Sequence, residues 1–475
     1  MRKIDLFIDG ESCAPCEERY DPLTGPVTDD TLAMVAQAGP QDVARAAKAA
    51  QNAFARERIT ARERANILAK AATLLVEHED ELAGLIVLEV GKTIREARGE
   101  VRTAADACAT FAAEALRVRG YTVDGDATPA TKDFEISVIR EPAGPVCALT
   151  AYNAPLNQVC YKVGMAFGAG CPVVLKPSPF TPMVTARAIA LLAEAGMGPG
   201  WINLVTGGVE VGQALFEAPE FTRYAFTGSR AVGEILVRSV GLRRSLLELG
   251  SNAPNIVHSD ADLALAAKAI TASGFAIAGQ VCMRPQRVLV HEDVMDAFAA
   301  HLVERVKAVR VGDPRDPETD MGPVRTEDSA ARIVDWVKQA EAAGAKVLTG
   351  GTHDGCYVAP TVVAGVRSGD LVACEEIFGP VLVLQSYATL DAALAEANAS
   401  KYGLQSAIFT TTLETARVAT RRLNAGGVVI NNASRMRTAL VPFGGAKDSG
   451  LGREGGPWGV EEFTEVKVVY HYFGT

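Results

Sequence analysis

The sequence has no long hydrophobic run. A helix that crosses a bilayer needs roughly 18 to 20 consecutive apolar residues, and no stretch of the 475-residue chain reaches that length. The first ten residues include Asp5 and Asp9 and have no sustained apolar core, which is not typical of a secretory signal or an anchor. We therefore expect a soluble, cytoplasmic protein without a membrane partner.

Positive charge and paired cysteines are also scarce. The chain has 47 Lys and Arg against 57 Asp and Glu, and the net charge of −10 argues against nucleic acid as the main partner. The nine cysteines are scattered and odd in number, which favours reduced thiols over a disulfide framework. Cys13 and Cys16 form a lone C-x-x-C, but no second pair or nearby histidine completes a zinc site, so we predict no metal.

No internal repeat or low-complexity linker divides the chain, although 475 residues usually form two or three domains. Helix formers with apolar residues every three or four positions predict helices over 40–118. Residues 120–140 are polar and turn-rich before Phe134, Ile136 and Val138 alternate, which indicates an extended excursion from the body.

Short apolar runs then alternate with helical patterns. This rhythm is typical of an α/β fold with parallel strands and helices on both faces. The last alternating segment, 466–470, resembles an edge strand. The expected strands are 146–151, 173–175, 202–205, 224–226, one near Asn255, and 288–290, and the helices between them are 183–195, 231–239, 261–278 and 295–309.

A thiol and a carboxylate suggest the chemistry. Cys282 follows Glu248 by 34 positions, and a thiolate attacks carbonyl carbon well. The adduct with an aldehyde goes further only if a nicotinamide removes hydride and a base activates water for hydrolysis. The alternative is that Cys282 is a buried apolar group, as most free cysteines are.

A dinucleotide site is suggested by Gly228, Ser229 and Gly233, which follow an apolar run at the start of an expected helix. Amides at a helix N-terminus suit a pyrophosphate, but the G-x-G-x-x-G fingerprint is absent, so an ordinary strand-to-helix turn is the alternative. Lys176 ends another expected strand, where it could bind a ribose hydroxyl or be a solvated loop lysine.

Seven features in this order and spacing resemble the aldehyde dehydrogenase superfamily. They are Asn153, Lys176, residues 226–233, Glu248, Cys282, Glu376-Ile377-Phe378-Gly379-Pro380 and Pro442-Phe443-Gly444-Gly445. The resemblance spans nearly the whole chain and implies two doubly wound α/β domains with a small β oligomerisation element. It implies a dinucleotide-binding domain of 1–119 and 141–247, a catalytic domain of 248–441, and an oligomerisation element of 120–140 and 457–475. It also implies a homodimer or homotetramer built by strand addition.

The resemblance implies roles for individual residues. Cys282 is the expected nucleophile and Glu248 the general base, while the amide of Asn153 and the backbone N–H of Cys282 form the oxyanion hole. Lys162 and Glu454 match positions with proton-relay roles. The expected cofactor-binding residues are Lys176, Ser178, Pro179, Gly228, Ser229, Gly233, Leu249, Glu376 and Phe378.

Two departures from the family pattern stand out. Ser251 follows Gly250, where the family usually repeats glycine. Pro179 stands where strictly NAD-dependent members carry a glutamate that repels a 2′-phosphate. The cofactor is therefore expected to be NADP or NAD.

The expected substrate residues make the tunnel look polar. Arg435 and Arg437 precede Phe443 by eight and six positions, and guanidinium groups bind carboxylate, phosphonate or sulfonate well. We therefore expect a small aldehyde with a polar or anionic tail, unless these arginines face solvent or pair with acids such as Glu461. The full set of expected substrate residues is Tyr152, Asn157, Gln158, Tyr161, Arg284, Arg435, Arg437 and Phe443.

The expected activity is NAD(P)-dependent oxidation of that aldehyde to a carboxylic acid. The presence of Glu248 argues against membership of the coenzyme A-dependent acylating branch, which generally lacks this base. The alternatives are an inactive superfamily member with a binding or structural role, aldehyde reduction, and a thiol-dependent esterase.

Overall fold

The computed structural model describes residues 2–28, 30–56 and 58–474. Its first sheet has eight strands in the order β24-β12-β11-β8-β9-β10-β2-β3. The five central strands are parallel, and the strands at the two edges are antiparallel. The strands are β8 (Val146–Leu149), β9 (Val173–Lys176), β10 (Ile202–Leu204), β11 (Arg223–Thr227), β12 (Arg244–Glu248), β2 (Leu6–Ile8), β3 (Glu11–Cys13) and β24 (Gly450–Leu451).

Helices cover both faces of this sheet. Alternate residues of a strand point to opposite faces, so the apolar side chains on each face pack against a separate set of helices. Val146 and Ala148 belong to one core cluster with α2 to α6, whereas Cys147 and Leu149 belong to another with α1, α7 and α8. The expected helical stretch is confirmed as α1 (Pro40–Arg56), α2 (Ala61–Glu77), α3 (Glu79–Val90) and α4 (Ile94–Ala115). The others are α5 (Pro155–Ala169), α6 (Pro182–Ala195), α7 (Val209–Glu217) and α8 (Arg230–Val240).

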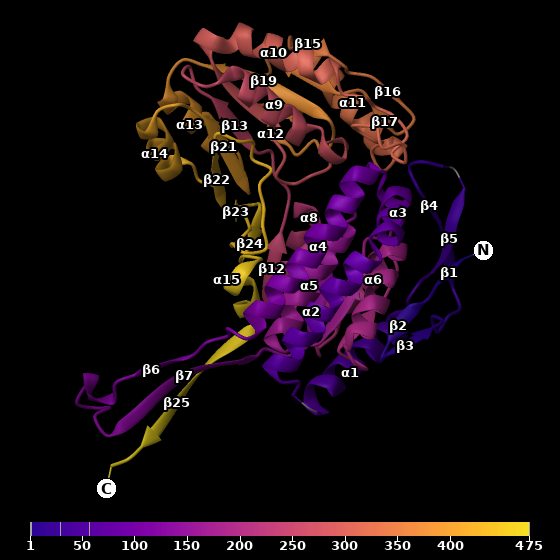
Figure 1. Cartoon of the computed structure of the whole chain (residues 1–475), viewed down its shortest axis with the longest axis vertical. Helices are drawn as coiled ribbons and strands as arrows, with labels where there is room; N and C mark the ends of the chain where they lie inside the picture. The colour runs from indigo at the N-terminus through magenta and orange to yellow at the C-terminus, as the bar shows by residue number, and fades with distance from the viewer. Residues whose placement is uncertain (1, 29, 57, 475) are drawn as a thin grey trace.

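A second sheet has seven strands in the order β15-β18-β19-β14-β13-β21-β22, with β15 alone antiparallel. Its strands are β13 (Pro254–Val257), β14 (Arg287–His291), β15 (Lys346–Thr349), β18 (Thr361–Ala364), β19 (Val381–Tyr387), β21 (Gln405–Phe409) and β22 (Gly427–Ile430). Its helices are α9 (Leu263–Gly274), α10 (Met295–Lys307), α11 (Glu327–Ala342), α12 (Leu371–Cys374), α13 (Leu390–Ala399) and α14 (Leu413–Arg422). The first and second sheets with their helices form the two halves of the body in Figure 1.

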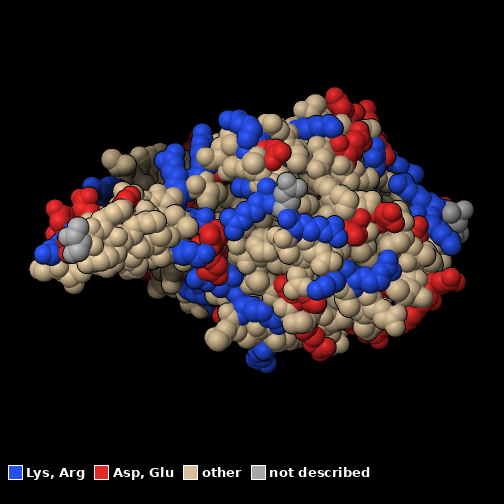
Figure 2. Space-filling view, turned by 90° about the horizontal axis from the view of Figure 1, so that it is seen from below, with Lys and Arg blue, Asp and Glu red and all other residues tan. Residues whose placement is uncertain are grey.

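A three-stranded arm projects from the body (Figure 1). It consists of β6 (Tyr121–Val123), β7 (Phe134–Pro142) and β25 (Thr464–Tyr472), so the expected excursion and the terminal edge strand are both confirmed. Tyr121, Val468 and Tyr470 are exposed apolar residues on it, and the arm, at the left in Figure 2, is largely uncharged. α15 (Gly456–Glu461) leads into β25.

Some elements were not predicted from the sequence. Three of them form a small sheet beside α6, namely β1 (Lys3–Ile4), β4 (Tyr20–Thr24) and β5 (Thr31–Ala36). Two further pairs are β16 (His353–Asp354) with β17 (Tyr357–Val358) and β20 (Tyr402–Gly403) with β23 (Ala446–Lys447).

The sulfurs of Cys13 and Cys16 lie 3.8 and 3.5 Å from nitrogens of the Arg45 guanidinium. In the part of the chain that the structure describes, no helix has the length and hydrophobicity of a membrane span.

Candidate active site

The expected catalytic and cofactor residues converge where the two sheets meet. Glu248 and Lys176 are the last residues of β12 and β9, and Asn153 lies between β8 and α5, so all three stand at the carboxyl edge of the first sheet. Cys282 comes from the other half, in the loop between the short 3₁₀ helix η2 (Ala276–Gly279) and β14. The carboxyl edge of parallel strands is the usual ligand site of such sheets.

Glu248 and Cys282 lie close enough for each to shift the pKa of the other. Burial raises the pKa of Glu248 to about 7, and its Oε1 has no hydrogen-bond partner among the described residues. Removal from water, and then the Glu248 charge, raise the pKa of the Cys282 thiol well above its ordinary value. The thiol therefore needs a base to lose its proton, and Glu248 is close to it and has a suitable pKa.

The side chain of Asn153 is held at both ends. Its Nδ2 donates to the carbonyl of Gln280 at 2.9 Å, and its Oδ1 accepts from Nε2 of Gln158 at 3.0 Å. Because an amide nitrogen carries two N–H groups, Asn153 keeps one donor for a ligand. The Gln158 Oε1 accepts from the backbone N–H of Ala151 at 2.6 Å. Gln158 is thus a support for Asn153, which corrects its expected place on the tunnel wall.

The loop that carries Cys282 has a strained backbone. Ile277 and Ala278 have φ values of +53° and +49°, in a region that costs non-glycine residues roughly 1–2 kcal/mol each. Gly279 follows at φ +72°, where an added Cβ would lie 2.1 Å from the carbonyl oxygen of Gly379. The surrounding structure must hold this turn in place.

Lys162 and Glu454 are buried, and the half-buried Arg437 joins them in a charged cluster. Nζ of Lys162 lies 2.8 Å from Oε1 of Glu454, and Nη2 of Arg437 lies 2.6 Å from Oε2. Lys162 also donates to the hydroxyl of Thr227 at 2.7 Å. Burial alone would raise the pKa of Glu454, but the two cations outweigh burial and lower it to about 2. Glu454 is therefore an anion near neutral pH, which disfavours the expected proton relay.

Arg437 also lies between two aromatic rings. Its guanidinium carbon is 4.0 Å from the ring centre of Tyr161 and 4.3 Å from that of Phe443. Its Nε is buried without a hydrogen-bond partner among the described residues. The Arg437 charge partly opposes the rise in the pKa of Cys282, so Arg437 lies near the thiol, and the expected substrate residues Tyr161 and Phe443 pack against it.

Other expected substrate residues have structural contacts. Arg284 is buried and donates to the carbonyls of Pro285 and Val381 at 2.8 and 2.9 Å. It is therefore not free to bind substrate, and its assignment to the tunnel is corrected. The Tyr152 hydroxyl donates to Oε1 of Gln280 at 2.9 Å, so Tyr152 braces the thiol loop.

Asn157 and Arg435 are in different settings. The side-chain nitrogen of Asn157 donates to Thr103 on α4 at 3.1 Å, but its buried Oδ1 has no partner among the described residues. Arg435 is partly exposed in the loop between β22 and β23. Glu461, the acid considered as an alternative partner, pairs with Arg140 at 3.0 Å.

A cavity of about 420 Å³ opens beside the end of β9. Its lining includes Pro177, Ser178, Pro179, Thr206, Gly207 and Gly208. Lys176 is buried immediately before this segment, and burial lowers its pKa to about 8. The alternative of a solvated loop lysine is therefore wrong.

The turn after β11 caps helix α8. Ser229 is the N-cap, and its hydroxyl accepts from the N–H of Val232 at 3.4 Å. A Cβ on Gly233 would lie 2.8 Å from Cδ2 of Leu249, so glycine lets the helix approach the loop after β12. The free amides of this helix start suit a phosphate group, whereas Gly233 and Leu249 act through packing.

Glu376 and Phe378 lie on the side of the second sheet. Oε1 of Glu376 accepts from the N–H of Ser251 at 3.0 Å. Burial raises the pKa of Glu376 to about 7. The ring of Phe378 packs edge-on against Tyr152, with ring centres 6.0 Å apart. The backbone N–H at position 251, which a glycine would supply equally, thus holds the expected ribose ligand, so the departure to serine leaves this contact unchanged.

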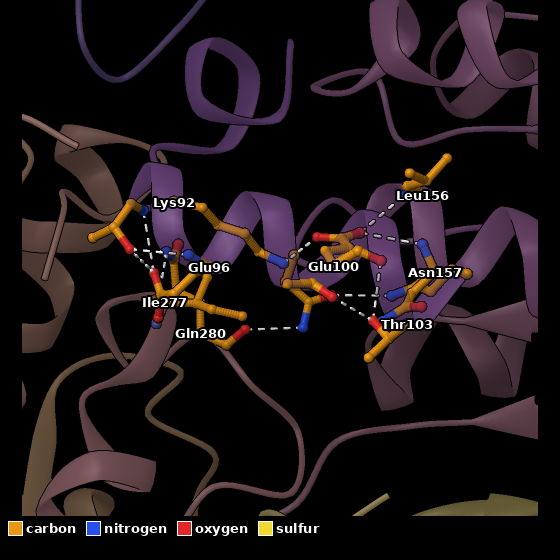
Figure 3. A network of polar contacts seen from close by, with 12 residues as sticks. Lys92, Glu96, Glu100, Thr103, Leu156, Asn157, Ile277 and Gln280 are labelled. Carbon is orange, nitrogen blue, oxygen red and sulfur yellow. Dashed lines mark hydrogen bonds and ion pairs between the residues drawn. The ribbon is translucent and has the colours of Figure 1, made fainter. Parts of the chain in front are cut away.

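Sequence reasoning missed the polar residues that support this site. Glu96 and Glu100 of α4, together with Gln280, connect the Asn153 turn to the Cys282 loop (Figure 3). Two glutamates four positions apart on a helix usually face solvent, and no motif identified them. Gln280 stands two residues before Cys282, but no motif assigns it a role.

Comparisons with known proteins identify the family. The profile of the aldehyde dehydrogenase family matches residues 14–469. The chain is 38% identical over 470 residues to 3-sulfolactaldehyde dehydrogenase of Priestia aryabhattai, covering 99% of this chain and 98% of the relative. It is 37% identical over 454 residues to mitochondrial succinate-semialdehyde dehydrogenase of Arabidopsis thaliana, covering 94% and 85%.

A solved structure agrees with this identification. The crystal structure of NAD-dependent aldehyde dehydrogenase from Sinorhizobium meliloti superposes with a TM-score of 0.96 at 37% identity, covering 100% of this chain and 95% of that one. The chain therefore belongs to the aldehyde dehydrogenase family, and the expected superfamily and fold are confirmed. It is an enzyme of aldehyde oxidation.

Proposed function

We propose that this protein oxidises a small aldehyde with an anionic tail to the carboxylic acid, with NAD or NADP as the hydride acceptor. The observation that carries the chemistry is the buried Glu248 carboxyl close to the Cys282 thiol. The observation that carries the substrate class is Arg437, which has a free Nε near the thiol.

Glu248 starts the reaction by accepting the proton of the Cys282 thiol. The sulfur then bonds to the aldehyde carbon, and the carbonyl oxygen becomes an oxyanion. The free N–H of Asn153 and the backbone N–H of Cys282 are the proposed donors to that oxygen. Losing one such donor typically slows a reaction by 10² or more.

Hydrolysis completes the cycle. A nicotinamide dinucleotide bound at the carboxyl edge of the first sheet would supply the hydride acceptor, and loss of hydride from the thiohemiacetal carbon leaves a thioester on Cys282. Glu248, after release of the thiol proton to solvent, accepts a proton from water, and the resulting hydroxide attacks the thioester carbon. The carbon–sulfur bond breaks, the carboxylic acid leaves, and the thiol regains a proton. The net reaction consumes aldehyde, water and oxidised dinucleotide and yields acid, reduced dinucleotide and a proton.

The cofactor fits the carboxyl edge of the first sheet. The cavity beside β9 offers Ser178 to an adenosine ribose, and the start of α8 offers backbone amides to a pyrophosphate. Lys176 and Glu376 are the proposed ribose ligands. Pro179 lines the cavity without a carboxylate, so no charge at that position opposes the 2′-phosphate of NADP.

Arg437 is the proposed receptor for the anionic tail. A guanidinium between two rings is held in one orientation, and Glu454 occupies only part of its donor set. The relatives named for 3-sulfolactaldehyde and succinate semialdehyde act on aldehydes that carry a sulfonate and a carboxylate, respectively. Arg435, on the same loop and partly exposed, is a secondary candidate at the tunnel entrance.

An aldehyde panel run with both dinucleotides tests the proposal. Succinate semialdehyde and butanal have the same number of carbons and differ mainly in tail charge, and 3-sulfolactaldehyde and phosphonoacetaldehyde extend the anionic set. We expect kcat/KM at least tenfold higher for the anionic member of the matched pair, since a hydrogen bond to a charged group contributes about 1.5–3 kcal/mol. A preference for butanal or longer unsubstituted aldehydes would overturn the anionic assignment.

We also propose the domain division, quaternary structure and cytoplasmic location expected from the sequence. The arm of β6, β7 and β25 is the proposed contact between subunits of a dimer or tetramer, because its exposed strand edges and apolar side chains suit strand addition. Light scattering of the full chain and of a variant that lacks residues 464–475 tests this assignment.

A further inference from the structure

We propose that Glu100 and Glu96, on one face of α4, are positioning residues for the oxyanion hole. This inference rests on the proposed function, because it assigns these residues to the reaction of Cys282. Figure 3 shows the two carboxylates on α4, with the loop of Ile277 and Gln280 near one and the start of α5 near the other. The two loops that supply the oxyanion donors are thus tied to the same helix.

Glu100 holds the segment that follows Asn153. Its Oε1 accepts from the backbone N–H groups of Leu156 and Asn157, at 2.9 and 3.2 Å. These are the first free amides of α5, because Pro155 has no N–H and the N-cap Ala154 has no side-chain acceptor. Glu100 therefore caps α5 from another helix, and it fixes where the Asn153 turn ends.

The Glu100 carboxylate cannot move freely. Glu100 and Lys92 are both buried, and Oε2 of Glu100 is paired with the Lys92 ammonium. A buried ion pair is costly to separate, since either charge alone would lie in a poorly solvated site. Lys92 thus fixes the position of the acceptor that Leu156 and Asn157 require.

Glu96 holds the other loop. Its Oε1 accepts from the N–H of Ile277 at 2.8 Å, while its Oε2 accepts from the N–H of Thr93 at the start of α4. Ile277 is the first of the three left-handed residues that lead toward Cys282. Such a turn persists only where its surroundings hold it, and Glu96 supplies one of those contacts.

Gln280 joins the two loops. Its carbonyl accepts from Asn153, and its Oε1 accepts from Tyr152 and from the N–H of Arg325. The Asn153 amide and the Cys282 loop are therefore in contact with each other and are each anchored to α4. Oxyanion stabilisation depends on donors fixed before the reaction, and a shift of either anchor would move one donor relative to the other.

Two reactions of Cys282 separate positioning from stability. In acylation by 4-nitrophenyl acetate, the sulfur bonds to the carbonyl carbon, the carbon–oxygen bond to 4-nitrophenolate breaks, and Glu248 takes the thiol proton. The carbonyl oxygen becomes negative on the way, so this reaction uses the oxyanion hole. In alkylation by iodoacetamide, the sulfur displaces iodide from a methylene carbon, and no oxyanion forms. The ratio of the acylation rate to the alkylation rate therefore measures the oxyanion hole separately from the reactivity of the thiol.

The variants are Glu100→Leu, which removes the acceptor, and Glu100→Gln, which keeps an oxygen but loses the charge. Glu114→Leu is the matched control, because Glu114 is also buried on α4 but pairs with Arg117 at the other end of the helix. We expect Glu100→Leu to lower the acylation-to-alkylation ratio at least tenfold and Glu100→Gln to lower it about threefold. Glu114→Leu should leave the ratio within twofold.

The inference is overturned if the ratio is unchanged in Glu100→Gln, if both rates fall in parallel, or if Glu114→Leu lowers the ratio equally. If Glu100→Leu does not fold, the ratio in Glu100→Gln decides, and Glu96→Gln gives an independent value for the second anchor. Failure of the proposed function looks different. In that case the wild-type protein is not acylated, or Cys282→Ala releases 4-nitrophenolate as fast as the wild type.

Discussion

Arg437 donates through Nη2 to Oε2 of Glu454 at 2.6 Å, and its charge also acts on the thiol of Cys282. The pair orients the guanidinium without using all of its donors, because Nε remains without a partner among the described residues. A cation that is held in place and partly unsatisfied is suited to binding an anion. The proposed anion receptor therefore depends on the charge of Arg437.

Substitution of Arg437 should change specificity more than catalysis. We expect Arg437→Gln to lower kcat/KM for succinate semialdehyde at least tenfold relative to butanal, because a charged hydrogen bond to the tail is lost. Arg437→Lys should recover only part of the difference, since an ammonium lacks the planar fork. Steady-state kinetics with both aldehydes measures this ratio. Arg435→Gln is the control. A larger change in the kcat/KM ratio in Arg435→Gln than in Arg437→Gln would assign the receptor to Arg435 at the tunnel entrance.

The acid limb of the pH profile should belong to Glu248. Its pKa of about 7 means that it is protonated below neutral pH and cannot accept a proton there. We expect kcat/KM to rise with pH through about 7 and to level off above it. In Glu248→Gln, kcat/KM measured from pH 5 to 9 should be low and should not rise through pH 7. An unchanged limb in that variant would assign the titration to another group.

Removing Lys162 should destabilise the fold. Lys162 is fully buried, and Glu454 stays ionised through Lys162 and Arg437. Breaking a buried pair by removing one partner costs about 3–5 kcal/mol, so Lys162→Met should unfold at clearly lower urea concentration. Arg238→Met, which affects an exposed pair with Glu234, should unfold within about 0.5 kcal/mol of the wild type. Equal stability of the two variants would contradict a structural role for Lys162.

The sequence predicted the parts of the fold that have strong periodic patterns. The helices of 40–118 and the central strands of the first sheet were recognisable because their apolar spacing follows the geometry of the helix and the strand. The small N-terminal strands and the two-residue pairs were not, because such short segments have no period to detect. β24 shows the same limit, since its two residues join the sheet only through contact with β12.

The site was predictable where a motif carries the chemistry, as for Cys282, Glu248, Asn153 and Lys176, which the structure brings to one region. Residues that act through tertiary contact were not. Gln158 and Arg284 looked like polar tunnel residues, but the backbone groups that they bind are apparent only in the folded chain. The role of Glu100 could not be predicted for the same reason, because the backbone amides that it binds lie 56 and 57 residues away in the sequence.

A carboxylate introduced at position 179 should shift cofactor preference toward NAD. Pro179 lines the cavity beside Ser178, where a glutamate would repel a 2′-phosphate. We expect Pro179→Glu to lower kcat/KM with NADP at least tenfold and to leave the value with NAD equal or higher. Pro179→Gln, of the same size but neutral, should have a smaller effect. Equal losses in both variants would show that size, and not charge, matters there.

The central claim is that Cys282 carries the acyl group and Glu248 releases it. In Glu248→Gln mixed with succinate semialdehyde and the preferred dinucleotide, mass spectrometry of the digested protein tests this most directly. We predict one acyl group per active site on the peptide of Cys282, with the mass of the aldehyde less two hydrogens, and an equal amount of reduced nicotinamide. The acyl group should form slowly, because in this variant the thiol must lose its proton to solvent, and it should then persist, because no base activates water. Reduced nicotinamide formed at the wild-type rate by Cys282→Ala, or an acyl group on another residue, would contradict the account.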